Sequence, residues 1–263
     1  MKSAYGLAAA LTLFFIASEA SAQTIGGKVR RWEAEIKGDI RVDDEGLEGT
    51  NVDVDETFGF DEEEDFDELH VTLGLPIIGR FNYQYLRGEY EGEKTLTANF
   101  NFGGQTFAAS TRIDARLDFQ AHTILWQFGA NTPGFIGADV GAGMVAGIKY
   151  FDIVAEVDDE FGNQEDTKIK APVPVIGAYA RFALASFIAV EAQVHGISFF
   201  DTFDTGLKGI FYDATLAVDV KFKGLFVGAG YRIMRMDVEY ENSTDVDVDL
   251  ELNGIFFEAG FAF

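Results

Sequence analysis

The sequence has 263 residues and a formal net charge of −24, from 44 acidic and 20 basic side chains, and it contains no cysteine. So large a negative charge argues against nucleic acid and anionic lipid as binding partners, because both carry the same sign. The absence of cysteine excludes disulfide bonds, and the length suits one large domain.

The first 22 residues predict a secretory signal peptide. Lys2 precedes an apolar run over residues 7–17, and Ala20-Ser21-Ala22 has the small-x-small pattern of a cleavage site. The apolar run is shorter than the roughly 20 residues that a membrane-spanning helix needs. We therefore divide the chain into a signal peptide at 1–22 and a single domain at 23–263.

The domain repeats one pattern, in which apolar and polar side chains alternate over ten or more residues before a break. In the first stretch, Trp32 and Ile36 share one face, whereas Arg31 and Glu35 share the other. Successive side chains of a strand point to opposite faces, so this period of two predicts β-strands with one apolar and one polar face.

The longest apolar stretch, 171–190, is predicted to form two strands around a tight turn. It contains Pro172 and Pro174, and two prolines this close together would break a helix. With this stretch included, the pattern predicts an all-β fold of ten antiparallel strands, with eight or twelve as alternatives. The expected strands are 28–42, 68–78, 80–94, 107–126, 135–151, 168–183, 187–199, 209–222, 225–240 and 246–263.

The connections between these strands alternate in length. Those at 79, 127–134, 184–186 and 223–224 are short, whereas those at 43–67, 95–106, 152–167, 200–208 and 241–245 are long or polar. The excess acid is concentrated in three segments, 43–68, 152–170 and 237–251. Short turns at one end and long loops at the other are typical of closed transmembrane β-barrels, whose short turns are periplasmic and whose long loops are extracellular.

The C-terminus ends in an apolar alternating strand that closes on an aromatic residue. Ile255, Phe257, Ala259, Phe261 and Phe263 share one face, and Phe263 is the last residue. This strand resembles the C-terminal assembly signal of Gram-negative outer-membrane β-barrels, in which Phe257, Phe261 and Phe263 would carry the signal.

The resemblance identifies the superfamily and no single member of it. It implies a closed antiparallel barrel in the bacterial outer membrane, exported by its signal peptide and inserted by the barrel assembly machinery. Its partners would be membrane lipid and lipopolysaccharide, with no nucleic acid, and the expected state is a monomer.

The charged faces of two strands are predicted to point into the lumen and to interlock there. A barrel of this size is only a little wider than one that side chains fill, so we expect a largely plugged lumen. A narrow cation-preferring, porin-like channel is the alternative. The predicted lumen charge network consists of Arg31, Glu33, Glu35, Lys37, Asp39, Arg41, Arg112, Asp114, Arg116 and Asp118.

Two acidic stretches are candidate sites for Ca²⁺ or Mg²⁺, because crowded carboxylates offer the hard oxygen ligands that these ions prefer. The candidate ligands are Asp61, Glu62, Glu64, Asp65, Asp245, Asp247 and Asp249. Such an ion would be loosely bound, and no other cofactor is expected. The alternative is an acidic surface that is simply solvated.

Two further expectations concern the backbone and the histidines. The apolar face changes from odd to even residue numbers within 225–240 and back again within 246–263, which predicts β-bulges near residues 234–235 and 253–254. His70, His122 and His195 all fall on predicted inward faces but too far apart to share one site.

The sequence therefore favours a non-enzymatic envelope or surface-interaction protein with acidic, cation-attracting outer loops. An enzyme at the barrel rim, acting on lipid A or peptides as a hydrolase or acyltransferase, is a further alternative. Its motif is weak, because His195 and Ser198 are three residues apart and would lie on opposite faces of a strand.

Overall fold

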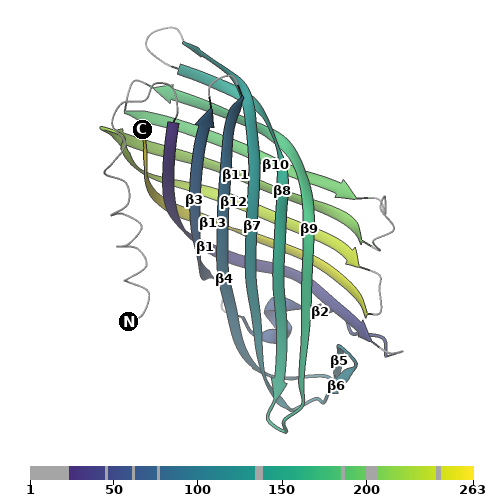
Figure 1. The fold of residues 1–263 in the computed structure, drawn as a ribbon. Coiled ribbons are helices and arrows are strands. Elements are labelled where there is room, and N and C mark those ends of the chain that lie inside the picture. The colour runs from purple at the N-terminus through teal and green to yellow at the C-terminus, as the bar shows by residue number, and fades with distance from the viewer. Residues whose placement is uncertain are drawn as a thin grey trace.

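The computed structural model describes residues 24–44, 47–60, 63–75, 78–133, 139–184, 187–199, 207–240 and 244–263. The predicted signal peptide lies outside these ranges. Ten long strands follow one another around a closed antiparallel ring, and the last strand pairs with the first. Figure 1 shows this barrel, which confirms the predicted fold class and strand number.

The ring consists of β1 (Thr24–Asp44), β3 (Glu64–Leu75), β4 (Gly79–Thr95), β7 (Arg112–Pro133), β8 (Asp139–Asp159), β9 (Gln164–Leu184), β10 (Ile188–Phe199), β11 (Leu207–Phe222), β12 (Leu225–Tyr240) and β13 (Thr244–Ala262). The other elements of secondary structure in the described residues are three short strands and one helical turn: β2 (Val52–Asp53), α2 (Val54–Phe58), β5 (Phe100–Phe102) and β6 (Gln105–Phe107). The described residues contain no helix with the length and apolar character that a membrane crossing requires.

Most predicted strands lie close to the observed ones, but β8 and β9 extend into the segment that was predicted to be a loop between them. The sequence 152–167 was predicted to be a loop because it is acidic, yet it forms strand up to Asp159 and again from Gln164. The connection is a turn at 160–163. Buried Ile153 and Val157 alternate with charged neighbours here, so the period of two continues through the acidic segment.

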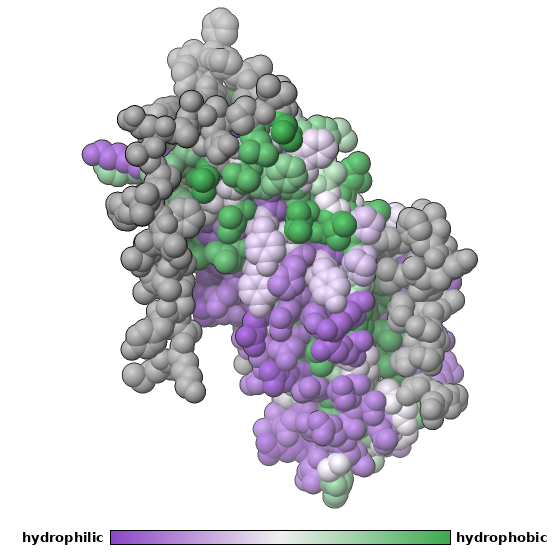
Figure 2. Space-filling model, viewed as in Figure 1, coloured by the Kyte–Doolittle hydropathy of each residue, from purple (hydrophilic) through white to green (hydrophobic). Residues whose placement is uncertain are grey.

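The barrel has two parts whose outer surfaces differ. Toward the end where β1 begins and β13 ends, hereafter the terminal end, the outward side chains are apolar. We call this surface the apolar band: Leu69, Val71, Leu73, Phe81, Ile124, Trp126, Met144, Ile148, Ile176, Val194, Leu216, Val218, Val220, Val227, Ile255 and Phe257. Toward the opposite or loop end, the outward side chains are charged, and Figure 2 shows this change from apolar to hydrophilic surface along the molecule.

The interior changes in the opposite sense at the same level. In β3, Glu68 and His70 point inward behind the apolar band, whereas Phe66 points inward behind charged Asp65 and Asp67. The part that continues beyond the band, which we call the charged extension, therefore has a dry apolar interior and a charged exterior. It comprises residues 31–44, 64–67, 86–95, 112–121, 151–159, 164–175, 234–240 and 244–253.

This inversion occurs without any break in strand register. The pairing of β12 with β13 runs from Leu225↔Phe261 to Tyr240↔Val246 with a constant offset. The predicted bulges near residues 234–235 and 253–254 are therefore wrong. The apolar residues change face because the environments inside and outside the barrel exchange, while the backbone continues unchanged.

Aromatic side chains fill the interior of the charged extension. Trp32 packs on Phe66 with ring centroids 5.4 Å apart, and Phe66 packs in turn on Tyr90 and Phe119. Gly88 of β4 lies directly under the Phe66 ring, where any Cβ would collide with it. These residues belong to one buried apolar cluster that includes side chains from opposite walls.

The segments between β1 and β3 and between β4 and β7 close this interior from the loop end. Phe58 of α2 contacts Phe100 and Phe102 of the β5–β6 hairpin, with centroids 6.1 and 6.2 Å apart. Val52 and Val54 are also buried there. Long connections that looked like solvated loops thus supply part of the core.

Candidate functional site: a closed lumen

The centre of the lumen is occupied by Arg232 of β12, which joins carboxylates from two distant strands. Its Nε and Nη2 donate to the two oxygens of Asp213, at 3.0 and 2.6 Å, and its Nη1 donates to Oε1 of Glu68 at 3.1 Å. All three side chains are almost completely buried. A buried charge is tolerated only when it is paired and hydrogen-bonded, and this bidentate geometry meets that condition.

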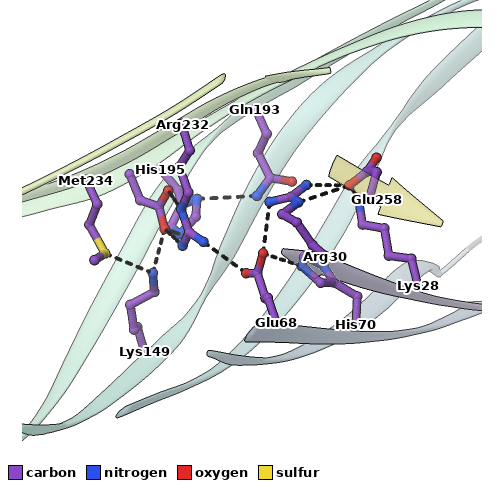
Figure 3. Close-up of polar contacts among 11 residues, drawn as sticks. Lys28, Arg30, Glu68, His70, Lys149, Gln193, His195, Arg232, Met234 and Glu258 are labelled. Carbon is purple, nitrogen blue, oxygen red and sulfur yellow. Dashed lines mark hydrogen bonds and ion pairs between the residues drawn. The ribbon is translucent and has the colours of Figure 1, made fainter. Parts of the chain in front are cut away.

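A second arginine extends the network toward the terminal end. Arg30 donates through Nη1 to Oε2 of Glu68 at 3.0 Å and through Nε and Nη2 to Oε2 of Glu258, at 3.0 and 2.8 Å. Lys28 Nζ lies 3.0 Å from the same Glu258 oxygen. Figure 3 shows these side chains pointing toward one another across the lumen.

Lys149 and two histidines complete the network. Lys149 Nζ donates to Oδ2 of Asp213 at 2.6 Å. His70 Nε2 lies 2.9 Å from Oε2 of Glu68, and His195 Nε2 lies 3.7 Å from Oδ2 of Asp213. Because Arg232 joins those two acids, both histidines belong to one network, which corrects the expectation that they lie too far apart. His122 instead points outward, where Tyr83 Oη is 2.9 Å from its Nδ1.

The lumen is therefore closed in two successive ways. From the terminal end, a polar cavity of about 200 Å³ leads to the ion network and is lined there by Glu68, His70, His195 and Arg232. Beyond the network, toward the loop end, lies the aromatic cluster described above. An ion crossing the barrel would have to separate buried ion pairs and then enter an apolar core.

The predicted lumen charge network is wrong in its residues, although a charged network does exist. All ten predicted side chains lie on the outer face of the charged extension, while the residues between them, such as Ile36 and Leu117, are buried inside. The charges form pairs on that outer surface: Arg31 with Asp65 and Asp67, Lys37 with Glu35, Arg41 with Asp43 and Asp247, Arg112 with Glu93 and Asp114, and Arg116 with Glu89 and Asp118. Glu33 and Asp39 face the same exterior.

The predicted metal ligands do not converge. Among the residues that the structure describes, no group of three or more acidic or histidine side chains could hold a metal ion. Asp245, Asp247 and Asp249 are spaced along the outer face of β13, and Asp249 accepts a bond from Arg235 Nη2 at 3.2 Å. Glu64 and Asp65 lie on opposite faces of β3, whereas Asp61 and Glu62 lie outside the described residues.

The predicted assembly signal lies at the end of β13, the strand that closes the ring by pairing with β1. Phe257 is exposed in the apolar band, and Phe261 packs on Phe263 with ring centroids 5.6 Å apart. The backbone of Phe263 exchanges two 3.0 Å hydrogen bonds with Ile25. These contacts explain why the C-terminal strand matters for closing the barrel; its role in assembly stays a prediction.

No protein-family model matches this sequence. No curated protein matches it either. Among solved structures, the outer membrane protease OmpT from Escherichia coli aligns with TM-score 0.46 and 10% identity over 94% of this chain and 99% of that one. The translocator domain of the autotransporter NalP from Neisseria meningitidis aligns with TM-score 0.45 and 10% identity over 98% of this chain and 95% of that one.

A third similar structure is Ail, the attachment invasion locus protein of Yersinia pestis, with TM-score 0.34 and 8% identity over 91% of this chain and 99% of that one. Likenesses this distant concern the fold alone. The hydrogen-bonded ring itself defines the fold: the chain is a closed ten-stranded antiparallel β-barrel, as predicted.

Proposed function

We propose that this chain is a non-enzymatic outer-membrane barrel with a closed lumen, which presents the charged extension at the cell surface as an interaction surface. This proposal rests on one observation: at the same level along the barrel, the exterior changes from apolar to charged and the interior changes from polar to apolar. An apolar exterior over a polar interior suits a wall in lipid, and a charged exterior over an apolar interior suits a domain in water.

The dimensions of the apolar band support this placement. On β11, outward apolar side chains run from Ala214 to Phe222, which matches the roughly 9–11 residues that a tilted transmembrane strand needs. The acidic loop end would then lie outside the cell and the terminal end would face the periplasm. The chemistry at the rim offers little support for the enzyme alternative, because His195 is buried in the ion network and Ser198 points outward.

The two tryptophans provide a direct test of membrane placement. Trp126 is 40% exposed within the apolar band, whereas Trp32 is 0% exposed inside the barrel. In vesicles with brominated acyl chains, we expect strong quenching of the fluorescence of a Trp32→Phe variant, which retains Trp126. The Trp126→Phe variant, which retains Trp32, should be almost unaffected. Equal quenching of the two would contradict the assignment of inside and outside.

The closed lumen is tested by conductance in a planar bilayer. The refolded mature chain should show no steady openings in KCl, because the ion network and the aromatic cluster both obstruct the path. Folding of the same sample is checked by its shift on a gel between heated and unheated protein. Steady cation-selective openings from folded protein would instead support the channel alternative.

A further inference from the structure

The wall of the charged extension has a notch between β9 and β10. These strands pair from Ile188↔Leu184 as far as Gly196↔Ile176, and the pairing ends there. β9 nevertheless continues to Gln164 with β8 as its partner, while β10 continues to Phe199 with β11. On the β10 side, the pairing of the described residues therefore stops short of residues 169–175 of β9.

Two prolines explain why the pairing ends at this point. The pairing of β8 with β9 runs unbroken past Pro172 and Pro174, so the positions that lack an N–H face the other side, toward β10. Continuing the β9–β10 register would place Pro174 opposite Ser198, where no donor is available. The two prolines thus account for the end of the β9–β10 pairing at Ile176.

Behind the notch lies an apolar cavity of about 50 Å³. Ala171 and Val173 of β9 form one wall, and residues of β11, β12 and β13 form the other. Every residue that lines the cavity is apolar: Phe151, Ile153, Ile169, Ala171, Val173, Phe211, Met236, Val238, Val246 and Val248. Its walls cannot satisfy a polar group, so hydrocarbon is the chemistry that fits.

The floor of the notch lies at the edge of the apolar band. Ile176 and Ile148, the outermost band residues beside it, are 57% and 55% exposed. Farther along β9, beyond Pro172 and Pro174, Lys168 and Lys170 flank Asp152, at 3.5 and 2.9 Å, and these three groups together carry one net positive charge. The hydrogen bond from Lys170 holds the pKa of Asp152 below its ordinary value, so this carboxylate is charged at neutral pH.

From this arrangement we infer that the notch admits one acyl chain of an anionic outer-leaflet lipid, sideways from the bilayer. The end of the chain occupies the apolar cavity, and the headgroup phosphate lies against Lys168 and Lys170. This inference rests on the proposed membrane placement, because the lipid must reach the notch at the level of Ile176.

Photolabelling in nanodiscs tests the site on the unaltered protein. The probe is phosphatidylglycerol with a diazirine at the end of one acyl chain, and the labelled residues are mapped by mass spectrometry. We expect labels on inward residues of the cavity, such as Ile169, Val173 and Met236, in addition to the apolar band. Labels confined to outward residues such as Leu216 and Val218 would overturn the inference and leave membrane placement intact. Labels on neither surface would overturn both.

A matched pair of variants on β9 sharpens the test. Ala171→Phe fills the cavity and should lower labelling of the other cavity residues about tenfold, since it displaces roughly two methylene groups of the chain. Ala178→Phe places the same ring outward, in the band, and should leave cavity labelling unchanged. Equal labelling in the two variants, each shown folded by its gel shift, would contradict a chain in this cavity.

The headgroup contact has a separate readout. Replacing both lysines, Lys168→Gln with Lys170→Gln, should lower the labelling of the cavity by phosphatidylglycerol about two- to fivefold relative to phosphatidylcholine with the same diazirine chain. If the two lipids labelled the cavity in the same ratio as in the unaltered protein, the lysines would not bind the headgroup. If a diazirine fatty acid added from water labels the cavity and the bilayer lipids do not, the ligand does not enter from the membrane.

Discussion

Replacing Arg232 with methionine should cost about 3–5 kcal/mol of unfolding free energy, the largest loss that we expect from any one side chain of the ion network. The substitution keeps much of the side-chain volume but removes three hydrogen bonds to Glu68 and Asp213. Glu68 would retain Arg30 and Asp213 would retain Lys149, but each carboxylate would stay buried with one partner fewer. Equilibrium unfolding in urea, from refolded protein in detergent or lipid, measures the loss.

Arg235→Met is the matched control, because it changes the same residue type on the same strand three positions away. The Arg235 side chain is 41% exposed on the outer face, where Nη2 bonds Asp249 at 3.2 Å. Exposed pairs contribute only about 0–1 kcal/mol, so this variant should unfold almost like the unaltered protein. If both variants lost the same unfolding free energy, the buried ion network would not stabilise the barrel more than an exposed ion pair does.

Closure into a ring was predicted from the loop lengths and the C-terminal strand, whereas period-two alternation predicted the ten strands, since each strand keeps its parity from end to end. It did not reveal which face is inside. In β1, Lys28 and Arg30 share a face with Trp32 and Ile36, so polar and apolar residues succeed one another on the same face. Around Trp32 that face was read as lipid-facing, which placed the charges of Arg31 and Glu35 wrongly in the lumen.

The missing information was the level along each strand at which the outer surface changes from charged to apolar. The signal was present as a reversal of polarity within a strand of unbroken parity. In β3, outward Asp65 and Asp67 are followed by outward Leu69 and Val71. In the last hairpin the same reversal was interpreted as a bulge. A bulge would shift the backbone register, whereas a change of environment leaves it intact, and the constant β12–β13 offset distinguishes the two.

The residues of the ion network could not be grouped from the sequence for a different reason. Glu68, Asp213 and Arg232 come from β3, β11 and β12, and their heights coincide only through the registers of all the strands between them. Each register depends on the length of a turn, and an error of a few residues in any turn moves an acid away from its arginine. Thus the presence of a charged plug was predictable, but its members were not.

Trp32→Ala should destabilise the barrel by about 3–5 kcal/mol, as expected when a fully buried indole is removed from a close-packed interior. Trp32 joins the two halves of the lumen, since its ring packs on Phe66 on one side and lies 4.6 Å from the Arg232 guanidinium on the other. Its Nε1 has no hydrogen-bond partner within the described residues. Trp32→Phe should therefore retain most of the stability, because it keeps an aromatic ring and loses no hydrogen bond.

Trp126→Ala is the comparison that separates interior packing from the mere loss of an indole. Trp126 lies in the apolar band, donates to the backbone oxygen of Ile78 at 2.7 Å and stacks on Phe81. Its removal leaves no cavity in the lumen, so the loss in unfolding free energy should be clearly smaller than for Trp32→Ala. If Trp126→Ala were the more damaging, barrel stability would rest chiefly on contacts at the outer surface of the apolar band. A larger loss for Trp32→Ala than for Trp126→Ala is expected if the aromatic cluster and the ion network stabilise the barrel as one continuous plug, joined at Trp32.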